Sequence, residues 1–133
     1  SLSLREELQQ IVNESSESTG IKIRSSIQEI NADGEQHRFI CNTFKEGISN
    51  GLRHGNATAF WFELRLNEGM IEFLLSDNGA GAKMLEIKEG LGLYGMKERA
   101  ERLGGEITFS SEPDEGFEIF LKLPYKGEKE TTK

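Results

Sequence analysis

The sequence predicts an α/β fold of two layers, in which three helices cover one face of a mixed, mainly antiparallel sheet. Segments with helical hydrophobic spacing share the chain with segments of alternating pattern. Most of the alternating segments follow one another across short turns, which favours hairpins. A length of 133 residues suits a single core. We therefore expect one domain over residues 1–125 and a solvated tail over residues 126–133.

Composition limits the classes of partner. The net charge of −7 argues against nucleic acid, whose binding needs a basic surface, but it leaves a single nucleotide possible. The sequence has no apolar run near the roughly 20 residues that a membrane helix needs. Cys41 is the only cysteine and lies within a helical pattern, so we expect a small buried thiol. These features favour a cytoplasmic domain without a membrane segment.

The first half of the chain predicts a helix, a strand and a second helix. Residues 2–18 carry apolar side chains at helical spacing, and residues 21–30 carry alternating isoleucines. Residues 35–54 have an unbroken apolar stripe with a period of four residues: Ile40, Phe44, Ile48 and Leu52. This stripe must face a core.

The second half predicts four strands and one short helix. Residues 60–66 and 70–75 alternate and are joined by a turn, so they should pair as an antiparallel hairpin. Residues 76–92 break all periodicity and are rich in glycine. Residues 93–103 then regain helical spacing, and two further strands begin at residue 107 and at residue 117.

The long second helix carries three polar residues on one side. Glu46, Asn50 and Arg53 fall within an arc of about 60°, opposite the apolar stripe. Asn is a poor residue for the middle of a helix, and its oxygen can serve a hard metal ion. Gly47 and Gly51 flank it, which indicates close packing against the helix. The alternative is an ordinary solvated helix face.

Two glycine-rich segments follow. Asp77-Asn-Gly79-Ala-Gly81 directly follows an apolar strand, where a carboxylate can accept a hydrogen bond and glycines let a flat ligand approach. Gly90-Leu-Gly92-Leu93 precedes a helix, whose unpaired N–H groups and dipole attract phosphate. Either segment alone could be a plain turn, and neither matches a P-loop or a Rossmann fingerprint.

The order of the three motifs resembles the GHKL, or Bergerat-fold, superfamily of ATP-binding domains, which includes gyrase-type ATPases, heat-shock chaperones, histidine kinases and MutL proteins. Glu46 to His54 resembles the N box, Asp77 to Gly81 the first glycine box, and Gly90 to Leu93 the second. The runs Asn50-Gly-Leu-Arg-His-Gly-Asn-Ala-Thr58 and Gly92-Leu-Tyr-Gly-Met-Lys-Glu-Arg are most similar to sensor histidine kinases of the nitrate-sensor and lipid-desaturase-sensor type.

This resemblance implies a role for each residue of the first motif. Asn50 would coordinate the Mg²⁺ that bridges the phosphates of ATP. Glu46 would hold that ion's water shell or act as a base. Arg53 and His54 would lie near the phosphates.

The resemblance also implies roles for the glycine-rich motifs. Asp77 would bind the adenine amine, with Gly79 and Gly81 leaving room for the base. Residues 82–90 would cover the nucleotide, with Lys83 and Lys88 more often solvated than bound to phosphate. The backbone of Gly90, Gly92 and Leu93 would face the phosphates. One residue departs from the family pattern, because Phe117 stands where a threonine normally contributes to the adenine pocket.

The implied reaction needs a second domain. A histidine kinase transfers the γ-phosphoryl group to a histidine on its own dimerisation domain, for relay to a response regulator, and the parent is implied to be a homodimer. This chain has only His37 and His54, and we expect neither to be the acceptor. His54 belongs to the N box, and His37 has no acidic neighbour in the sequence.

Two other functions remain open at this stage. An anti-sigma-factor serine kinase shares the fold and has about this length. A non-catalytic interaction module could also retain the fold and have lost nucleotide binding.

Overall fold

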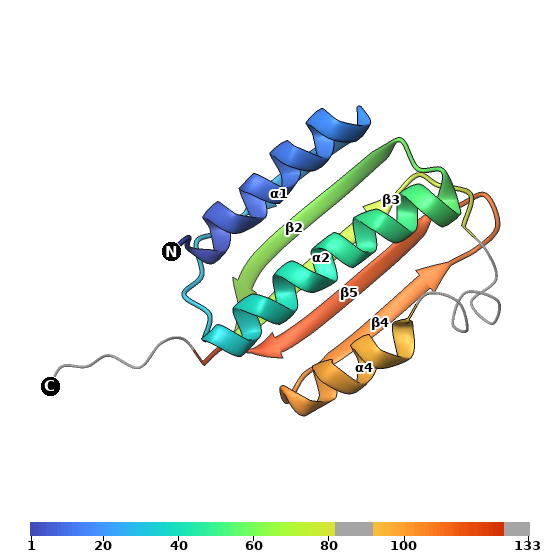
Figure 1. Cartoon of the computed structure of the whole chain (residues 1–133). Coiled ribbons are helices and arrows are strands. Elements are labelled where there is room, and N and C mark those ends of the chain that lie inside the picture. Colours follow the sequence, from blue (N-terminus) through green and yellow to red (C-terminus); the bar gives the residue numbers. More distant parts are fainter. Residues whose placement is uncertain (82–91, 127–133) are drawn as a thin grey trace, which may run out of the picture.

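The computed structural model describes residues 1–81 and 92–126, and these residues form two layers (Figure 1). One layer is a five-stranded sheet and the other consists of three helices on a single face of it, as the sequence predicts. The strands lie in the order β1 (Lys22–Ile27), β2 (Ala59–Asn67), β3 (Met70–Asp77), β5 (Phe117–Pro124) and β4 (Glu106–Ser111). Only β1 and β2 run parallel; the other neighbours are antiparallel.

Each long helix begins with a capping box. Helix α1 (Leu4–Thr19) starts after Ser3, which exchanges hydrogen bonds with Glu6. Helix α2 (Gly34–Gly55) starts after Asp33, which does the same with Gln36. These reciprocal bonds satisfy N–H groups that a helix start leaves unpaired. Local sequence therefore fixes where both helices begin.

Helix α2 packs across the middle of the sheet. Phe44 lies against Phe62, with ring centroids 4.3 Å apart, and Phe62 meets Phe73 edge-on at 5.0 Å. Farther along the helix, a Cβ on Gly47 would lie 2.5 Å from the side chain of Leu75. Glycine therefore lets the helix approach the sheet more closely there than a larger residue could.

The third helix, α4 (Leu93–Arg102), covers the other edge of the sheet beside β4. The sheet face away from the helices is partly polar and carries a close ion pair between Arg65 and Glu72, at 2.7 Å. Among the described helices, none combines the length and the apolar character that spanning a membrane would require.

Candidate functional site

The site lies where the second half of α2 meets the end of β3. Gly51 makes this contact possible, because a Cβ there would lie 2.7 Å from the ring of Phe60 and 2.8 Å from Oδ2 of Asp77. The first two motifs of the sequence therefore come together. Asn50 precedes the glycine that touches the Asp77 carboxylate, so the amide and the acid belong to one region.

Asn50 is buried, and this corrects one expectation. The sequence places Asn50 opposite the apolar stripe, together with Glu46 and Arg53, yet only 4% of Asn50 is exposed. The helix is rotated so that Gly47, Asn50 and Gly51 turn inward, while Leu52 of the apolar stripe is only half-buried. The physical reason is the small size of the glycines, which lets this side of the helix approach the sheet closely.

The amide nitrogen of Asn50 has no hydrogen-bond partner among the described residues. This Nδ2 atom is buried without one, and so is Oγ1 of Thr43, two turns earlier on α2. A buried polar group without a partner costs free energy, so nearly all such groups are paired in proteins. The Nδ2 donor of Asn50 is therefore available to a ligand.

A cavity of about 630 Å³ lies between α4 and α2, the helix that carries Asn50. Its lining comes from both helices: Asn42, Thr43, Lys45, Glu46, Ser49, Arg53, Met96 and Arg99. Glu46 and Arg53 are largely exposed there and form a loose ion pair at 3.8 Å. His54 is exposed at the last turn of α2, where a basic residue also suits the helix dipole.

Asp77 ends β3 as a buried carboxylate. Its Oδ1 accepts a hydrogen bond from the N–H of Gly79 at 2.8 Å, and the backbone N–H of Phe117 donates to it as well. Burial raises the pKa of Asp77 above its usual range, and these two hydrogen bonds only partly offset that effect. The group is thus held rigidly in a partly dry setting, where one further donor would be favourable.

The glycines after Asp77 serve the protein's own packing, which differs from the sequence-based reason. A Cβ on Gly79 would lie 2.8 Å from the carbonyl oxygen of Gly55 at the end of α2. A Cβ on Gly81 would collide with the backbone oxygen of Glu112, and Gly81 also has a positive φ of 63°. Both glycines therefore let backbone segments of the protein come close together.

Helix α4 begins without a side-chain cap. Gly92 is its N-cap, with a positive φ of 67° and no neighbouring atom near a built Cβ. The first-turn N–H groups of α4 are therefore not capped by a side chain. Leu93 is buried, so only its backbone could face a ligand. Gly90, Lys83 and Lys88 lie outside the described residues, as does the rest of segment 82–91.

Sequence reasoning missed two residues that shape the site. Asn78 fastens β3 to the loop after α2, since its Oδ1 accepts from the N–H groups of Thr58 and Ala59 at 2.9 and 3.0 Å. Nothing in a common Asp-Asn-Gly turn signals that role. Thr43 could have been found, because it lies one turn before Glu46 on the same side of the helix.

Phe117 pairs with Asp77 across β3 and β5. Its ring stacks on Phe109 at a centroid separation of 6.1 Å. The residue that replaces the expected threonine therefore gives Asp77 a backbone hydrogen bond and places an aromatic ring beside the site.

His37 differs from expectation in its surroundings. Although the sequence shows no acidic neighbour, Nε2 of His37 lies 2.8 Å from Oε1 of Glu7 on α1. An acidic partner therefore does exist, contributed by a different helix.

Comparison with known proteins agrees with this arrangement. Residues 35–127 match the family described as histidine kinase-, DNA gyrase B-, and HSP90-like ATPase. The chain belongs to this family. The match spans α2, the end of β3 and the start of α4, so it includes all three motifs.

Sensor histidine kinases are among the similar proteins. Sensor histidine kinase LiaS of Bacillus subtilis is 33% identical over 134 residues, which cover 96% of this chain and 37% of LiaS. Sensor protein VraS of Staphylococcus epidermidis is 32% identical over 131 residues, with coverages of 98% and 38%. Sensor histidine kinase LnrJ of Bacillus subtilis is 37% identical over 83 residues, with coverages of 62% and 20%. The chain thus spans less than two fifths of these relatives.

Solved structures show the same fold. The histidine kinase domain of the blue-light activated kinase EL346 from Erythrobacter litoralis aligns with a TM-score of 0.79 at 18% identity, over 93% of this chain and 62% of that one. The ATP-binding domain of PrrB from Mycobacterium tuberculosis aligns with a TM-score of 0.71 at 20% identity, over 95% and 96%. At these identities the likeness shows the fold, and it agrees with the family to which the chain belongs.

Proposed function

We propose that this domain supplies ATP for phosphorylation of a histidine on a dimerisation domain of the same kinase, for relay to a response regulator. Residues 1–125 would form the catalytic domain and residues 126–133 a tail, within a cytoplasmic part of a homodimeric parent. Its relatives named above are sensor kinases more than twice as long, which supports a parent of this kind.

The observation that carries the proposal is the buried side chain of Asn50, whose Nδ2 atom has no partner among the described residues, on the helix that contacts Asp77 through Gly51. An amide oxygen is a suitable ligand for Mg²⁺, which usually keeps several waters and binds nucleotide phosphates. The residues present fit such an ion: Asn50 would contact it directly, and Glu46, on the cavity wall, would contact its water shell. The ion would neutralise charge on the phosphates.

Each of the remaining site residues would contact a different part of the nucleotide. Asp77 would accept the adenine amine on its rigid carboxylate. The uncapped start of α4, at Gly92 and Leu93, would direct N–H groups at the phosphates together with Gly90. Arg53 would contribute positive charge at the cavity, with His54 next to it at the end of α2 near the phosphates, and Gly79 and Gly81 would hold the backbone around Asp77.

Finer similarity to the nitrate-sensor and desaturase-sensor kinases rests on the runs around Asn50 and after Gly92, and it is part of this proposal. The acceptor histidine would lie outside this chain. An anti-sigma-factor kinase of the same fold would phosphorylate a serine instead, which gives a direct chemical distinction.

The test is phosphorylation of the full-length kinase with ATP labelled at the γ-phosphate. We expect an acid-labile, base-stable phosphohistidine, which Asn50→Ala abolishes. Asn13→Ala changes an exposed asparagine on α1 and should leave labelling intact. The 133-residue chain alone should bind ATP and not label itself. Acid-stable phosphoserine on a partner, or stable phosphohistidine on this chain alone, would contradict the proposal.

A further inference from the structure

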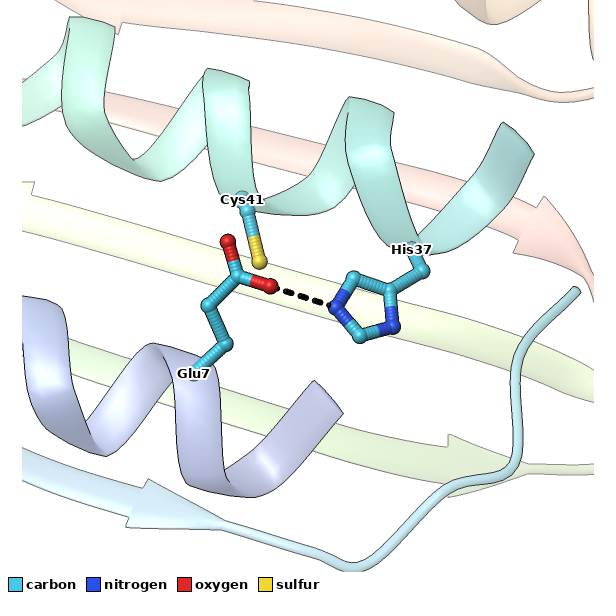
Figure 2. A group of neighbouring side chains, drawn as sticks. All are labelled: Glu7, His37 and Cys41. Carbon is cyan, nitrogen blue, oxygen red and sulfur yellow. Dashed lines mark hydrogen bonds and ion pairs between the residues drawn. The ribbon is translucent and has the colours of Figure 1, made fainter. Parts of the chain in front are cut away.

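Three side chains with metal-binding atoms converge between α1 and α2, on the far side of α2 from α4 (Figures 1 and 2). Glu7 comes from α1, and His37 and Cys41 come from α2. Their ligand atoms all lie within 4.8 Å of one another, and Nε2 of His37 lies 2.8 Å from Oε1 of Glu7. The ATP-binding role uses none of these residues.

The spacing suits a tetrahedral metal ion. His37 and Cys41 are four residues apart, so they lie on the same side of α2 and one turn from each other. Zinc binds nitrogen, sulfur and oxygen at about 2.0–2.3 Å, which places neighbouring ligand atoms about 3.3–3.5 Å apart. The observed separations bracket that value, so small side-chain rotations would complete the geometry.

The donor set selects the kind of ion. A thiolate and an imidazole are ligands for borderline and soft ions, and they disfavour Mg²⁺ and Ca²⁺. One carboxylate and one thiolate also balance the two positive charges of Zn²⁺, once the thiol proton has passed to solvent. We propose that Glu7, His37 and Cys41 bind one zinc ion between α1 and α2.

The surroundings leave one side open for the ion and a fourth ligand. Cys41 is 2% exposed, whereas the side chains of His37 and Glu7 are 24% and 34% exposed. His37 also lines a cavity of about 300 Å³ next to the start of α1. Zinc would enter from the Glu7 and His37 side, bind the sulfur at the closed end and retain a water as its fourth ligand.

Such an ion would join the two helices. Between α1 and α2, the partly exposed side chains of His37 and Glu7 form a hydrogen bond. The bond from Glu7 to an ion held by His37 and Cys41 would link α1 more firmly to the helix that carries Asn50. Zinc would therefore slow the movement of α1 relative to the nucleotide site.

The direct test is calorimetric titration of the chain with Zn²⁺ alone, without nucleotide, because phosphates also bind zinc. We expect one ion per chain. Cys41→Ala and Glu7→Gln should each weaken binding at least about tenfold, since even outer contacts of a metal site contribute that much. Glu14→Gln is the matched control on α1, since Glu14 is exposed and pairs only along the helix with Gln10. Its zinc affinity should equal that of the wild type.

Cobalt gives a second measurement that reports the sulfur itself. Co²⁺ in place of zinc should produce a thiolate charge-transfer absorption band that Cys41→Ala removes. Zinc should also raise the unfolding temperature of the wild type and leave that of Cys41→Ala unchanged. If Cys41→Ala does not fold, Glu7→Gln carries the test, because Glu7 is only half-buried.

Two results would overturn the proposal. One is the absence of zinc binding at micromolar concentrations, which would leave the group as a plain hydrogen-bonded contact between helices. The other is wild-type zinc affinity in both folded variants, which would place the ion elsewhere. Neither result bears on ATP binding, because the two sites share no residue.

Discussion

The two halves of α2 each bury an amide side chain, and the two amides differ in their hydrogen bonding. In the first half, the Gln36 side chain is fully buried and donates to the carbonyl oxygen of Pro124 at 2.5 Å, while its Oε1 accepts from the N–H of Asp33. In the second half, the buried Nδ2 atom of Asn50 has no partner among the described residues. The difference teaches that Gln36, at the start of the helix, stabilises the fold, whereas the Nδ2 atom of Asn50, in the last two turns, is left available to a ligand.

The largest effect should come from filling the contact that brings Asn50 and Asp77 together. Gly51→Val would force side-chain atoms into the ring of Phe60 and the carboxylate of Asp77. We expect a loss of about 3 kcal/mol in the free energy of unfolding, as overpacking typically gives, and loss of ATP binding. Gly34→Val, in open space at the other end of the helix, should change neither greatly. Denaturant unfolding measures both, and equal stabilities would refute the close approach.

Next comes the carboxylate of Asp77. Asp77→Asn keeps an oxygen for the Gly79 N–H but removes the charge, so ATP affinity should fall about tenfold to a hundredfold, the value of a hydrogen bond to a charged group. Asp114→Asn, at an exposed turn, is the matched control. Fluorescence titration with a labelled nucleotide gives both affinities, and unchanged binding in Asp77→Asn would remove Asp77 from the site.

The same substitution should not destabilise the empty domain near neutral pH. Because burial raises the pKa of Asp77, the folded state holds its proton more tightly than the unfolded state. Its contribution to stability is therefore present below the unfolded pKa and is lost as pH rises through the folded value. Thermal unfolding of Asp77→Asn should match or exceed that of the wild type at pH 7, and this advantage should vanish in acid. A lower midpoint at pH 7 would contradict this sign.

A change in the first half of α2 should lower the stability of the fold and leave ATP binding nearly unchanged. Gln36→Ala removes a buried side chain and leaves the carbonyl of Pro124 without its donor, at a cost of about 1–3 kcal/mol in unfolding free energy. ATP affinity should remain within twofold of the wild type. Gln9→Ala, on the exposed side of α1, provides the control for loss of a glutamine. Weaker ATP binding in folded Gln36→Ala would abolish the distinction between the two halves.

The smallest effect concerns Phe117. Phe117→Thr restores the residue that the resemblance leads one to expect, so ATP should bind somewhat more tightly. Stability should fall by about 1 kcal/mol because the contact with Phe109 is lost. Parallel titration and thermal unfolding would show both changes, and weaker ATP binding in this variant would mean that the aromatic ring itself supports the nucleotide.

Much of the fold could be predicted because its signals are local. The alternating strands and the stripe along α2 each follow from a few neighbouring residues. The rotation of α2 could not be predicted, since it depends on Gly47 and Gly51 meeting Leu75 and Asp77 from distant strands. Periodicity alone therefore placed Asn50 on the wrong side.

The candidate site shows the same limit. The three motifs indicate the nucleotide region because their order is distinctive, yet the reason for Gly79 and Gly81 lies in contacts with Gly55 and Glu112. The approach of Glu7 to His37 joins residues 30 positions apart and leaves no trace in either local pattern. Long-range packing decides such contacts, and a single sequence does not encode them visibly.

The most direct test of the central claim is calorimetry on Asn50→Ala, with ATP in the presence of Mg²⁺ and again with the metal chelated. The amide should serve the metal-bound nucleotide, so affinity for Mg·ATP should fall at least about tenfold, the scale of a hydrogen bond to a charged group. Affinity without metal and thermal stability should stay close to those of the wild type. Equal loss in both titrations, or none in either, would contradict the assignment of Asn50 to the metal.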